Sequence, residues 1–265
     1  MHIKQSVVIP MLQPDQMSLS DFLDGLKEIG FPAVEIWSRE GDFEAIVEGA
    51  LARDLRVVSM VGHSHESPTD GSHVEGFSRR KNHDLLEAEL RESIDIAVKY
   101  DIPGLITLSG HRNPGESDAE ALSICAEGLR RITPYAEEKS VNLNIELLNT
   151  SVDHPNYLCD NTDWAVALCE KVDSPRCKIL YDIYHMQIME GDLIRNLQRA
   201  AKWIGHYHTA GVPGRHDLDD LQEINYRALA HAIADTGYDL YVGHEFVPKG
   251  DVLAALQQAY SVMDV

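Results

Sequence analysis

Short apolar runs alternate with longer amphipathic stretches from one end of the chain to the other. The runs are rich in β-branched residues, and the stretches between them repeat apolar positions at three- and four-residue spacing, as from Leu86 to Ala97. The first pattern is typical of buried strands and the second of helices with one apolar face. Eight strands are predicted, which begin at or near Ser6, Ala33, Arg56, Gly104, Asn142, Cys177, Trp203 and Asp239.

Two of the predicted helices also carry clear start signals. Ser18 with Asp21, and Ser117 with Glu120, have the spacing of a capping box, in which the hydroxyl accepts from a free backbone amide and the acid reaches back. Strand and helix units of roughly 33 residues, joined by right-handed crossovers, close more readily into a barrel than into an open sheet. The sequence therefore predicts an α/β fold, a (β/α)₈ barrel formed as one domain by residues 1–265.

Two predicted connections are longer than a barrel requires. Residues 64–82 follow the third predicted strand, and residues 211–224 follow the seventh. Both leave the C-terminal ends of strands, where the active sites of such barrels are built. We expect them to cover a site or to contact a substrate, and surface loops without such a role are the alternative.

Polar side chains occur near the ends of four consecutive predicted strands. They are Glu146, Asp182, His208 and Glu245. Neighbouring strands lie about 5 Å apart, so these side chains are expected to converge at one rim of the barrel. Three carboxylates and an imidazole would repel one another without a cation. A divalent ion is therefore predicted, with Mn²⁺, Mg²⁺ or Co²⁺ favoured by the ligand types and Zn²⁺ also compatible.

The alternative is that these carboxylates are separately paired with basic side chains. The predicted strands contain few of them, namely Lys178 and Arg56. His206 precedes His208 by two residues and shares its face of the strand, so it is a candidate for orienting a carboxylate. His185 points away from the site if its strand stays regular and toward it if the strand end bends; it is a candidate donor to a substrate oxygen or a capped surface histidine.

The loop after the third predicted strand contains further candidate ligands. They are His63, His65, Glu66 and His73. Their spacing is irregular within a polar segment, so we favour histidines beside a pocket over a second metal site.

Charge restricts the partners of this protein. Of 265 residues, 43 are acidic and 23 are Lys or Arg, which gives a formal net charge of −20. Nucleic acids and anionic membranes are bound by clustered basic residues, so we expect neither as a partner. The substrate is expected to be a small molecule. A carboxylate substrate would need a local cation besides the metal, for which Arg215 and Lys249 are candidates.

Cysteine usage and the N-terminal sequence bear on location. The four cysteines form no C-x-x-C pair, so neither a zinc ribbon nor a disulfide framework is indicated. The chain shows no signal peptide and no apolar run of the roughly 20 residues that span a bilayer. We expect reduced thiols and a cytoplasmic protein, and a homo-oligomer would agree with the general preference for symmetric dimers.

Several stretches resemble the hydroxypyruvate isomerase family, within the xylose-isomerase-like (sugar isomerase and epimerase) barrel superfamily. They are NIELLN, YDIYHMQIMEGD, HYHTAGVPGRHD, EINY and YVGHEF in the second half, and NHDLLEAEL and GLITLSGHR in the first. The resemblance implies a (β/α)₈ barrel with one divalent metal that catalyses aldose–ketose interconversion, in the named family between hydroxypyruvate and tartronate semialdehyde. It further implies that Glu146 and Glu245 ligate the metal and transfer the proton, and that Asp182 is a further ligand.

One position departs from that family. Hydroxypyruvate isomerases commonly have Gln where this chain has His208, whereas His is similar to the ketose 3-epimerases, whose metal ligands are Glu, Asp, His and Glu. Those epimerases also have a His after the Asp and an Arg after the seventh strand, and His185 and Arg215 match them as candidate substrate-binding residues. An isomerase of hydroxypyruvate type is favoured, with a 3-epimerase of a free ketose as the alternative.

Both reactions remove a proton from a carbon beside a carbonyl. A cation that chelates the substrate oxygens stabilises the resulting enediolate, while carboxylates on opposite faces act as base and acid. A metal-dependent phosphodiesterase of the AP-endonuclease type shares the superfamily but needs several metals and a basic face, so it is less favoured. A noncatalytic metal or sugar sensor would have no use for the pair of carboxylates.

Overall fold

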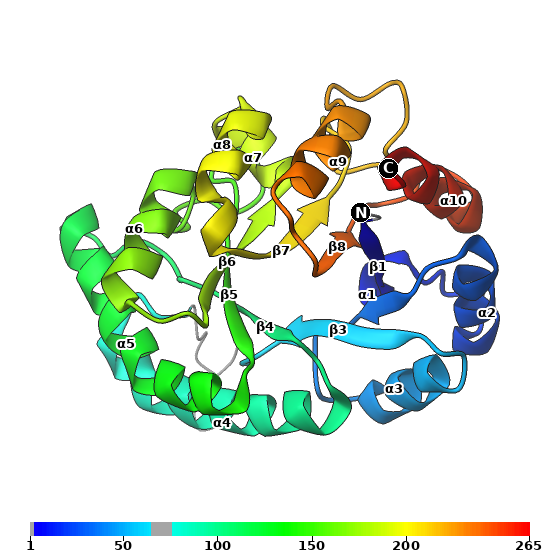
Figure 1. The fold of residues 1–265 in the computed structure, drawn as a ribbon. Coiled ribbons are helices and arrows are strands. Elements are labelled where there is room, and N and C mark those ends of the chain that lie inside the picture. Colours follow the sequence, from blue (N-terminus) through cyan, green and yellow to red (C-terminus); the bar gives the residue numbers. More distant parts are fainter. Residues whose placement is uncertain (1–2, 65–75) are drawn as a thin grey trace.

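The computed structural model describes residues 3–64 and 76–265. Within them, eight parallel strands pair in sequence order, and β8 pairs with β1 to close a barrel surrounded by helices (Figure 1). The predicted (β/α)₈ fold is confirmed. The strands are β1 Lys4–Val8, β2 Ala33–Glu35, β3 Arg56–Val61, β4 Gly104–Thr107, β5 Asn142–Glu146, β6 Cys177–Asp182, β7 Ile204–Thr209 and β8 Tyr241–His244.

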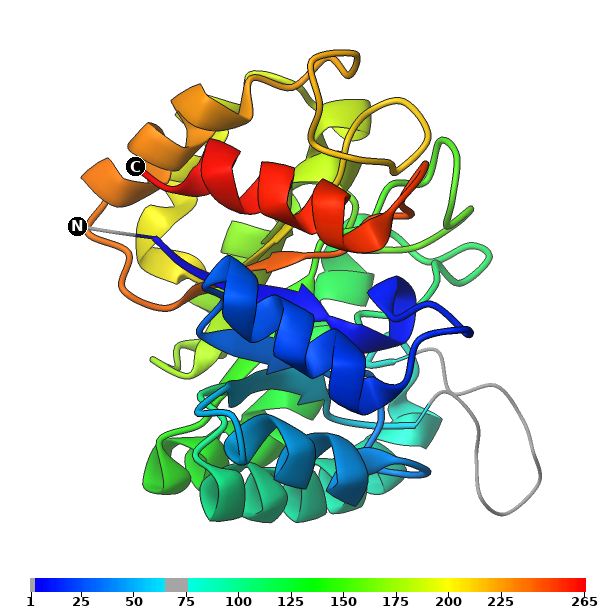
Figure 2. The same ribbon diagram turned by 90° about the vertical axis from the view of Figure 1, so that its right-hand side faces the viewer.

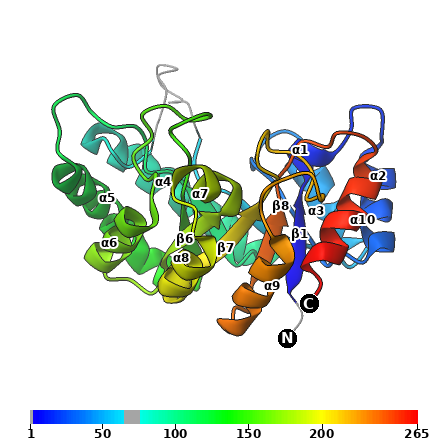
Figure 3. The same cartoon turned by 90° about the horizontal axis from the view of Figure 1, so that it is seen from above.

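The helices form the outer layer, and the last one contacts the first long one. Figures 1 and 3 both place α10 beside α2, which joins the two ends of the ring of helices. The α-helices are α1 Ile9–Leu12, α2 Leu19–Ile29, α3 Phe43–Leu51, α4 His83–Tyr100, α5 Asp118–Lys139, α6 Thr162–Val172, α7 Ile183–Met189, α8 Leu193–Ala200, α9 Tyr226–Asp235 and α10 Val252–Met263. Two short 3₁₀ helices are η1 Arg80–Asn82 and η2 Ala201–Trp203.

Both predicted capping signals lie at helix starts. The Ser18 hydroxyl accepts a hydrogen bond from the backbone N–H of Asp21 at the start of α2. At α5 the box is complete, since Ser117 accepts from the Glu120 amide and the Glu120 side chain accepts from the Ser117 amide. Each such cap stabilises a helix by about 1 kcal/mol. These two helices therefore begin where the sequence predicts.

Two strands end earlier than the lengths of their apolar runs suggest. The run that begins at Ser6 continues apolar to Leu12, but β1 ends at Val8 and a helical turn follows. Pro10 lies in its first turn, where the missing N–H of proline costs nothing. Likewise β6 ends at Asp182, and α7 begins at the next residue. An apolar run alone does not distinguish a strand from the buried helical turn that follows it.

The loops that follow the strands gather at one end of the barrel. In Figure 2, where α2 and α10 face the viewer, the loops after β5 and β7 project on the same side. The register of the parallel strands aligns their ends, with Asp182 opposite His208 and His208 opposite Gly243. Among the described helices, none combines the length and apolar character that a membrane crossing requires.

Candidate active site

The structure brings four predicted ligands together at the C-terminal end of the barrel. Glu146 ends β5, Asp182 ends β6, His208 lies near the end of β7 and Glu245 follows β8. One candidate ligand atom from each lies within 4.8 Å of the others, and all four residues are buried. Consecutive strands place them side by side because the barrel is closed and its strand ends are in register.

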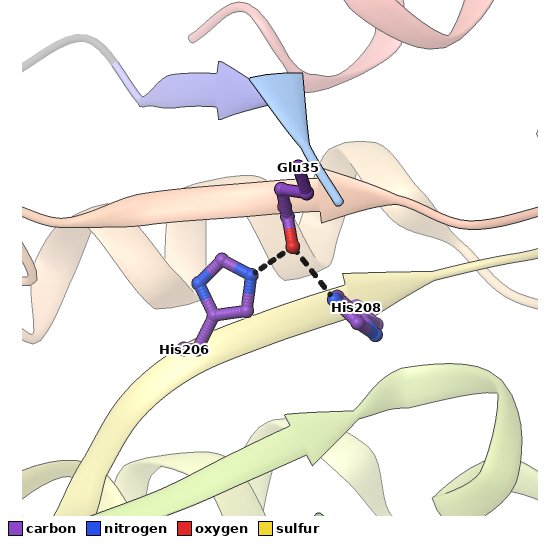
Figure 4. Close-up of side chains that lie close together, drawn as sticks. All are labelled: Glu35, His206 and His208. Atoms are coloured by element: carbon purple, nitrogen blue, oxygen red, sulfur yellow. Dashed lines mark hydrogen bonds and ion pairs between the residues drawn. The ribbon is translucent and has the colours of Figure 1, made fainter. Parts of the chain in front are cut away.

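A fourth carboxylate, which sequence reasoning missed, lies behind this cluster. Glu35 ends β2 and is 1% exposed. Its Oε2 lies 3.0 Å from Nε2 of His206 and 3.1 Å from Nε2 of His208 (Figure 4). The Ser6 hydroxyl donates to the other oxygen, Oε1, at 2.6 Å. His206 thus shares the inner face of β7 with His208, and the carboxylate that it contacts is Glu35.

Gly243 leaves the space that Glu35 occupies. A Cβ atom on Gly243 would lie 2.1 Å from Oε1 of Glu35 and 2.9 Å from Cδ2 of His208. Both distances are shorter than real Cβ contacts, so only glycine fits at this position of β8 without displacing the cluster. A charged residue within a short buried strand was the signal for Glu35, the same signal that identified the residues on the later strands.

Glu35 determines which nitrogen of His208 carries the proton. A carboxylate accepts hydrogen bonds, so Nε2 of His208 donates and Nδ1 presents its lone pair. Nδ1 is buried, forms no hydrogen bond with the described residues, and lies 3.2 Å from Oε2 of Glu245 and 3.6 Å from Oε1 of Glu146. A lone pair facing two carboxylate oxygens is repulsive unless a cation lies between them.

The electrostatics of the cluster also favour a cation. Burial would lower the pKa of His208, yet the charges of Glu245 and Glu35 raise it well above its ordinary value, so in the absence of a metal ion a proton on Nδ1 would take the place between the carboxylates. Burial raises the pKa of Asp182 to about 6, against the opposing charge of Arg215. Three carboxylate groups and one imidazole nitrogen form a donor set that fits one divalent ion such as Mg²⁺ or Mn²⁺.

Arg215, a candidate substrate-binding residue from the sequence, lies beside the cluster and is mostly buried. Its side chain is 21% exposed and donates to Oε2 of Glu245. The guanidinium lies 5.6 Å from the ring centre of Tyr184. Burial would raise the pKa of Glu245, but the charges of His208 and Arg215 lower it to about 2. Glu245 is therefore paired with a basic residue while it also faces the other predicted ligands.

His185 turns toward the site because the chain becomes helical. Asp182 is the N-cap of α7, and its Oδ1 accepts from the backbone N–H of His185 at 3.0 Å. One helical turn places Nε2 of His185 3.7 Å from Oδ2 of Asp182, with the His185 side chain fully buried. A capped surface histidine is thus wrong, and a regular strand, which would point the ring away, is not formed.

Trp37 was not singled out from the sequence. It follows β2, is 41% exposed, and its indole N–H donates to Oε1 of Glu245 at 3.3 Å. Trp37 and His63 both line a cavity of about 310 Å³ beside the strand ends. His63 interacts with backbone, since Leu108 N–H donates to its Nε2 at 3.2 Å. The other loop candidates, His65, Glu66 and His73, lie outside the described residues.

Comparison with known proteins places the chain in a family. The profile of the xylose isomerase-like TIM barrel matches residues 23–263. A Homo sapiens protein named "Putative hydroxypyruvate isomerase" is 29% identical over an alignment of 273 positions, which covers 99% of this chain and 96% of the human protein. The 2-oxo-tetronate isomerase of Cupriavidus necator is 33% identical over 181 residues, 64% of this chain and 66% of that protein.

Solved structures share the fold. A protein described as an AP endonuclease of family 2 from Brucella melitensis has a TM-score of 0.81 and 24% identity, and the match covers 96% of this chain and 97% of that one. D-psicose 3-epimerase from Clostridium cellulolyticum H10, solved with D-tagatose, has a TM-score of 0.75 and 18% identity over 99% and 100% of the two chains. The profile match extends over most of the chain, and the protein belongs to the xylose isomerase-like TIM barrel family.

Proposed function

We propose that this protein is a metal-dependent isomerase that interconverts a hydroxy-ketone and a hydroxy-aldehyde, in the manner of hydroxypyruvate isomerase. The names of its relatives support an isomerase. The observation that carries the proposal is the convergence of Glu146, Asp182, His208 and Glu245 around the Nδ1 lone pair of His208. A bound divalent ion held by these four residues would supply Lewis-acid chemistry at the oxygens of a hydroxy-carbonyl substrate.

The two glutamates are the proposed acid and base. Isomerisation requires that a proton leave one carbon and return to its neighbour, so a proton acceptor must lie within reach of both. Glu146 and Glu245 come from β5 and the end of β8, on either side of the strands that supply Asp182 and His208. This arrangement supports a role in which one carboxylate acts on each side of a substrate held between them.

Arg215 and His185 are the proposed substrate-binding residues. Both are largely buried, and both lie beside predicted ligands, Arg215 at Glu245 and His185 at Asp182. With a divalent ion bound, the charges of the three carboxylates would be balanced by the ion and Arg215. The site would then accept either a singly charged hydroxy-acid or a neutral sugar, and Arg215 would contribute most to binding the charged one.

A 3-epimerase of a free ketose is the second candidate. The observation that favours it is His208, since its presence in place of Gln is similar to the ketose epimerases. Epimerisation would use the same two glutamates but return the proton to the opposite face of the same carbon. The likeness to an AP-endonuclease structure concerns the fold, and the acidic cluster described here gives no specific support to phosphodiester cleavage.

A turnover screen tests the proposal. The protein is stripped with a chelator, reloaded with Mn²⁺ or Mg²⁺, and assayed on hydroxypyruvate, a 2-oxo-tetronate and free ketoses such as D-psicose and D-tagatose. Metal-dependent isomerisation of a hydroxy-acid supports the proposal, and epimerisation of a ketose alone supports the second candidate. Full activity in a verified metal-free sample would overturn both.

A further inference from the structure

Asn149 is a buried amide whose orientation is determined by the backbone. It lies three residues past the end of β5 and has no exposed surface. Its Oδ1 accepts from the backbone N–H groups of Val152 at 2.9 Å and Asp153 at 3.0 Å. Because backbone amides only donate, the oxygen of the side chain must face them, and the NH₂ group must point the other way.

The NH₂ group of Asn149 then faces two acceptors. Nδ2 lies 2.6 Å from Oδ2 of Asp153 and 2.7 Å from Nδ1 of His185. The Tyr184 hydroxyl donates to the same oxygen of Asp153 at 2.9 Å. Burial would raise the pKa of Asp153, but hydrogen bonds from Asn149 and Tyr184 lower it below its ordinary value, so this carboxylate is ionised and accepts. One amide hydrogen is directed to Asp153 and the other to His185.

These contacts assign the tautomer of His185. Its Nδ1 accepts from Asn149, so in the neutral ring the proton is on Nε2. Nε2 is buried, has no hydrogen-bond partner among the described residues, and lies 3.7 Å from Oδ2 of Asp182, which is beyond hydrogen-bond distance. A buried N–H donor beside the predicted ligands therefore lacks an acceptor within the described protein.

We propose that Asn149 is a positioning residue that holds His185 as a neutral imidazole, whose Nε2–H donates a hydrogen bond to the carbonyl oxygen of the substrate. This proposal rests on the proposed isomerase function and deepens it, because it identifies the substrate atom beside His185 as an oxygen that accepts a hydrogen bond.

The ring of His185 and the carboxylates then have separate roles in the reaction. When the proton leaves carbon for a carboxylate, the electron pair of its bond moves toward the carbonyl and negative charge grows on oxygen. A hydrogen bond from Nε2–H of His185 stabilises that charge without transferring its proton. His185 cannot serve as the base, because Nδ1 is occupied by Asn149 and Nε2 already carries a proton. The carboxylate then returns the proton to the neighbouring carbon, and the proton of the substrate hydroxyl passes to the former carbonyl oxygen, so the product is again a hydroxy-carbonyl compound.

An exchange of two side chains tests the role of Asn149. In the double variant Asn149→Asp/Asp153→Asn, the pair keeps its shape and its single negative charge, but the group that faces Nδ1 of His185 becomes an acceptor. The control is Tyr184→Phe, which removes a hydrogen bond to Asp153 and leaves the amide contact with His185 intact. Ring ¹⁵N signals of His185 are recorded in ¹⁵N-histidine-labelled protein loaded with Mg²⁺, and assigned by comparison with His185→Gln.

The expected result is Nε2–H with unprotonated Nδ1 in the wild type and in Tyr184→Phe, and a protonated Nδ1 in the double variant. The kcat of the double variant should fall by about 10²-fold, as when an oxyanion donor is removed, while Mg²⁺ affinity is unchanged. A wild-type ring protonated on Nδ1 would overturn the proposal, and this measurement does not depend on whether the double variant folds. Unchanged kcat in a double variant with a switched tautomer would also overturn it.

Failure of the proposed function would look different. If no hydroxy-carbonyl compound is turned over, the wild-type tautomer still reports on Asn149, and addition of glycolohydroxamate, a mimic of a deprotonated hydroxy-ketone, reports on the donor. The Nε2–H proton signal should move downfield when this probe binds to the Mg²⁺-loaded protein. Binding of the probe without that shift would count against His185 as the donor, whatever the reaction of the protein is.

Discussion

Oε2 of Glu35 lies 3.1 Å from Nε2 of His208, although the two residues are 173 positions apart in the chain. Closure of the barrel makes this contact, because the pairing of β1 with β8 leaves only these two strands between β2 and β7. Its consequence is that His208 directs Nδ1 toward the carboxylates at the strand ends. Glu35 thus fixes the orientation and the tautomer of a predicted metal ligand, which is the usual role of a carboxylate behind a ligating histidine.

Replacement of Glu35 by Gln should weaken metal binding. A glutamine presents one accepting oxygen and one donating NH₂ group, so it no longer fixes Nε2 of His208 as the donor. The expected loss of Mn²⁺ or Mg²⁺ affinity is about 10- to 100-fold, measured by competition with a chelator of known affinity. The control is Ser6→Ala, which removes the hydrogen bond to Oε1 of Glu35 without touching His208. An equal loss in both variants would indicate a general weakening of the barrel interior.

A side chain at position 243 should disturb the same contact by steric means. In Gly243→Ala the new Cβ overlaps Oε1 of Glu35, so the cluster or strand β8 must shift. We expect a loss of about 1 to 3 kcal/mol in the free energy of unfolding, together with weaker metal binding. Gly250→Ala is the matched control, because a Cβ there meets nothing within 4 Å. Urea unfolding of both variants measures the difference, and equal stability would contradict the role given to Gly243.

The four candidate ligands could be predicted from the sequence because barrel closure orders the strand ends. Glu146, Asp182, His208 and Glu245 lie at or next to the ends of successive strands, so their position in the chain determines their position on the rim. Glu35 could not be ranked in the same way. Its strand spans three residues, and the contact that makes it significant depends on a partner from β7, far away in the sequence.

The loop and helix residues of the site depend on local backbone geometry that periodicity does not describe. His185 faces the site because α7 begins at Ile183, and an apolar run gives no sign that a strand has become a helix. Asn149 lies outside strands and helices, and its role comes from two backbone amides in the following turn. Hydrophobic patterning predicts which residues are buried, but it does not predict the path of such connections.

Metal binding should stabilise the folded protein. The three carboxylates are close together and buried, so an ion that binds the folded state relieves their repulsion and shifts unfolding by mass action, by about 2.7 kcal/mol at a concentration of 100 times Kd. We expect Tm to rise with Mn²⁺ or Mg²⁺ and to fall again with a chelator. The shift should vanish in Asp182→Asn and persist in Asp24→Asn, whose side chain pairs with Arg53 on the surface. A shift of equal size in both variants would point to binding elsewhere.

Removal of the Arg215 side chain should discriminate between substrate charges. Its guanidinium is the cation beside Glu245, and a charge-assisted hydrogen bond to a substrate carboxylate contributes about 1.5 to 3 kcal/mol. Arg215→Ala should therefore raise KM for hydroxypyruvate by more than it raises KM for a neutral ketose. Lys249→Ala, which removes a half-exposed cation paired with Asp219, is the control. If KM rises equally for both substrates, Arg215 serves to hold Glu245 and does not recognise substrate charge.

Replacement of Glu146 or Glu245 by Gln should separate proton transfer from metal ligation. If Glu146 and Glu245 only ligate the metal, replacement of either by Gln should weaken metal binding, and excess metal should restore turnover. We expect instead that turnover stays low by about 10²- to 10⁴-fold in samples verified to be metal-loaded, because an amide oxygen can coordinate but cannot accept a proton at neutral pH.

Isotope exchange distinguishes proton transfer through a carboxylate from a direct hydride shift between neighbouring carbons. Proton transfer through a carboxylate exposes the migrating hydrogen to solvent, so product formed in D₂O by the wild-type protein should contain deuterium at the reacting carbon. A hydride shift between neighbouring carbons keeps the original hydrogen. The control measures how fast the abstracted proton exchanges with solvent, to exclude a carboxylate that returns the same proton before exchange. If the product still lacks deuterium, both glutamates lose the acid and base roles and remain only as ligands. Because His185 already carries its proton on the nitrogen that faces the site, it could not replace them.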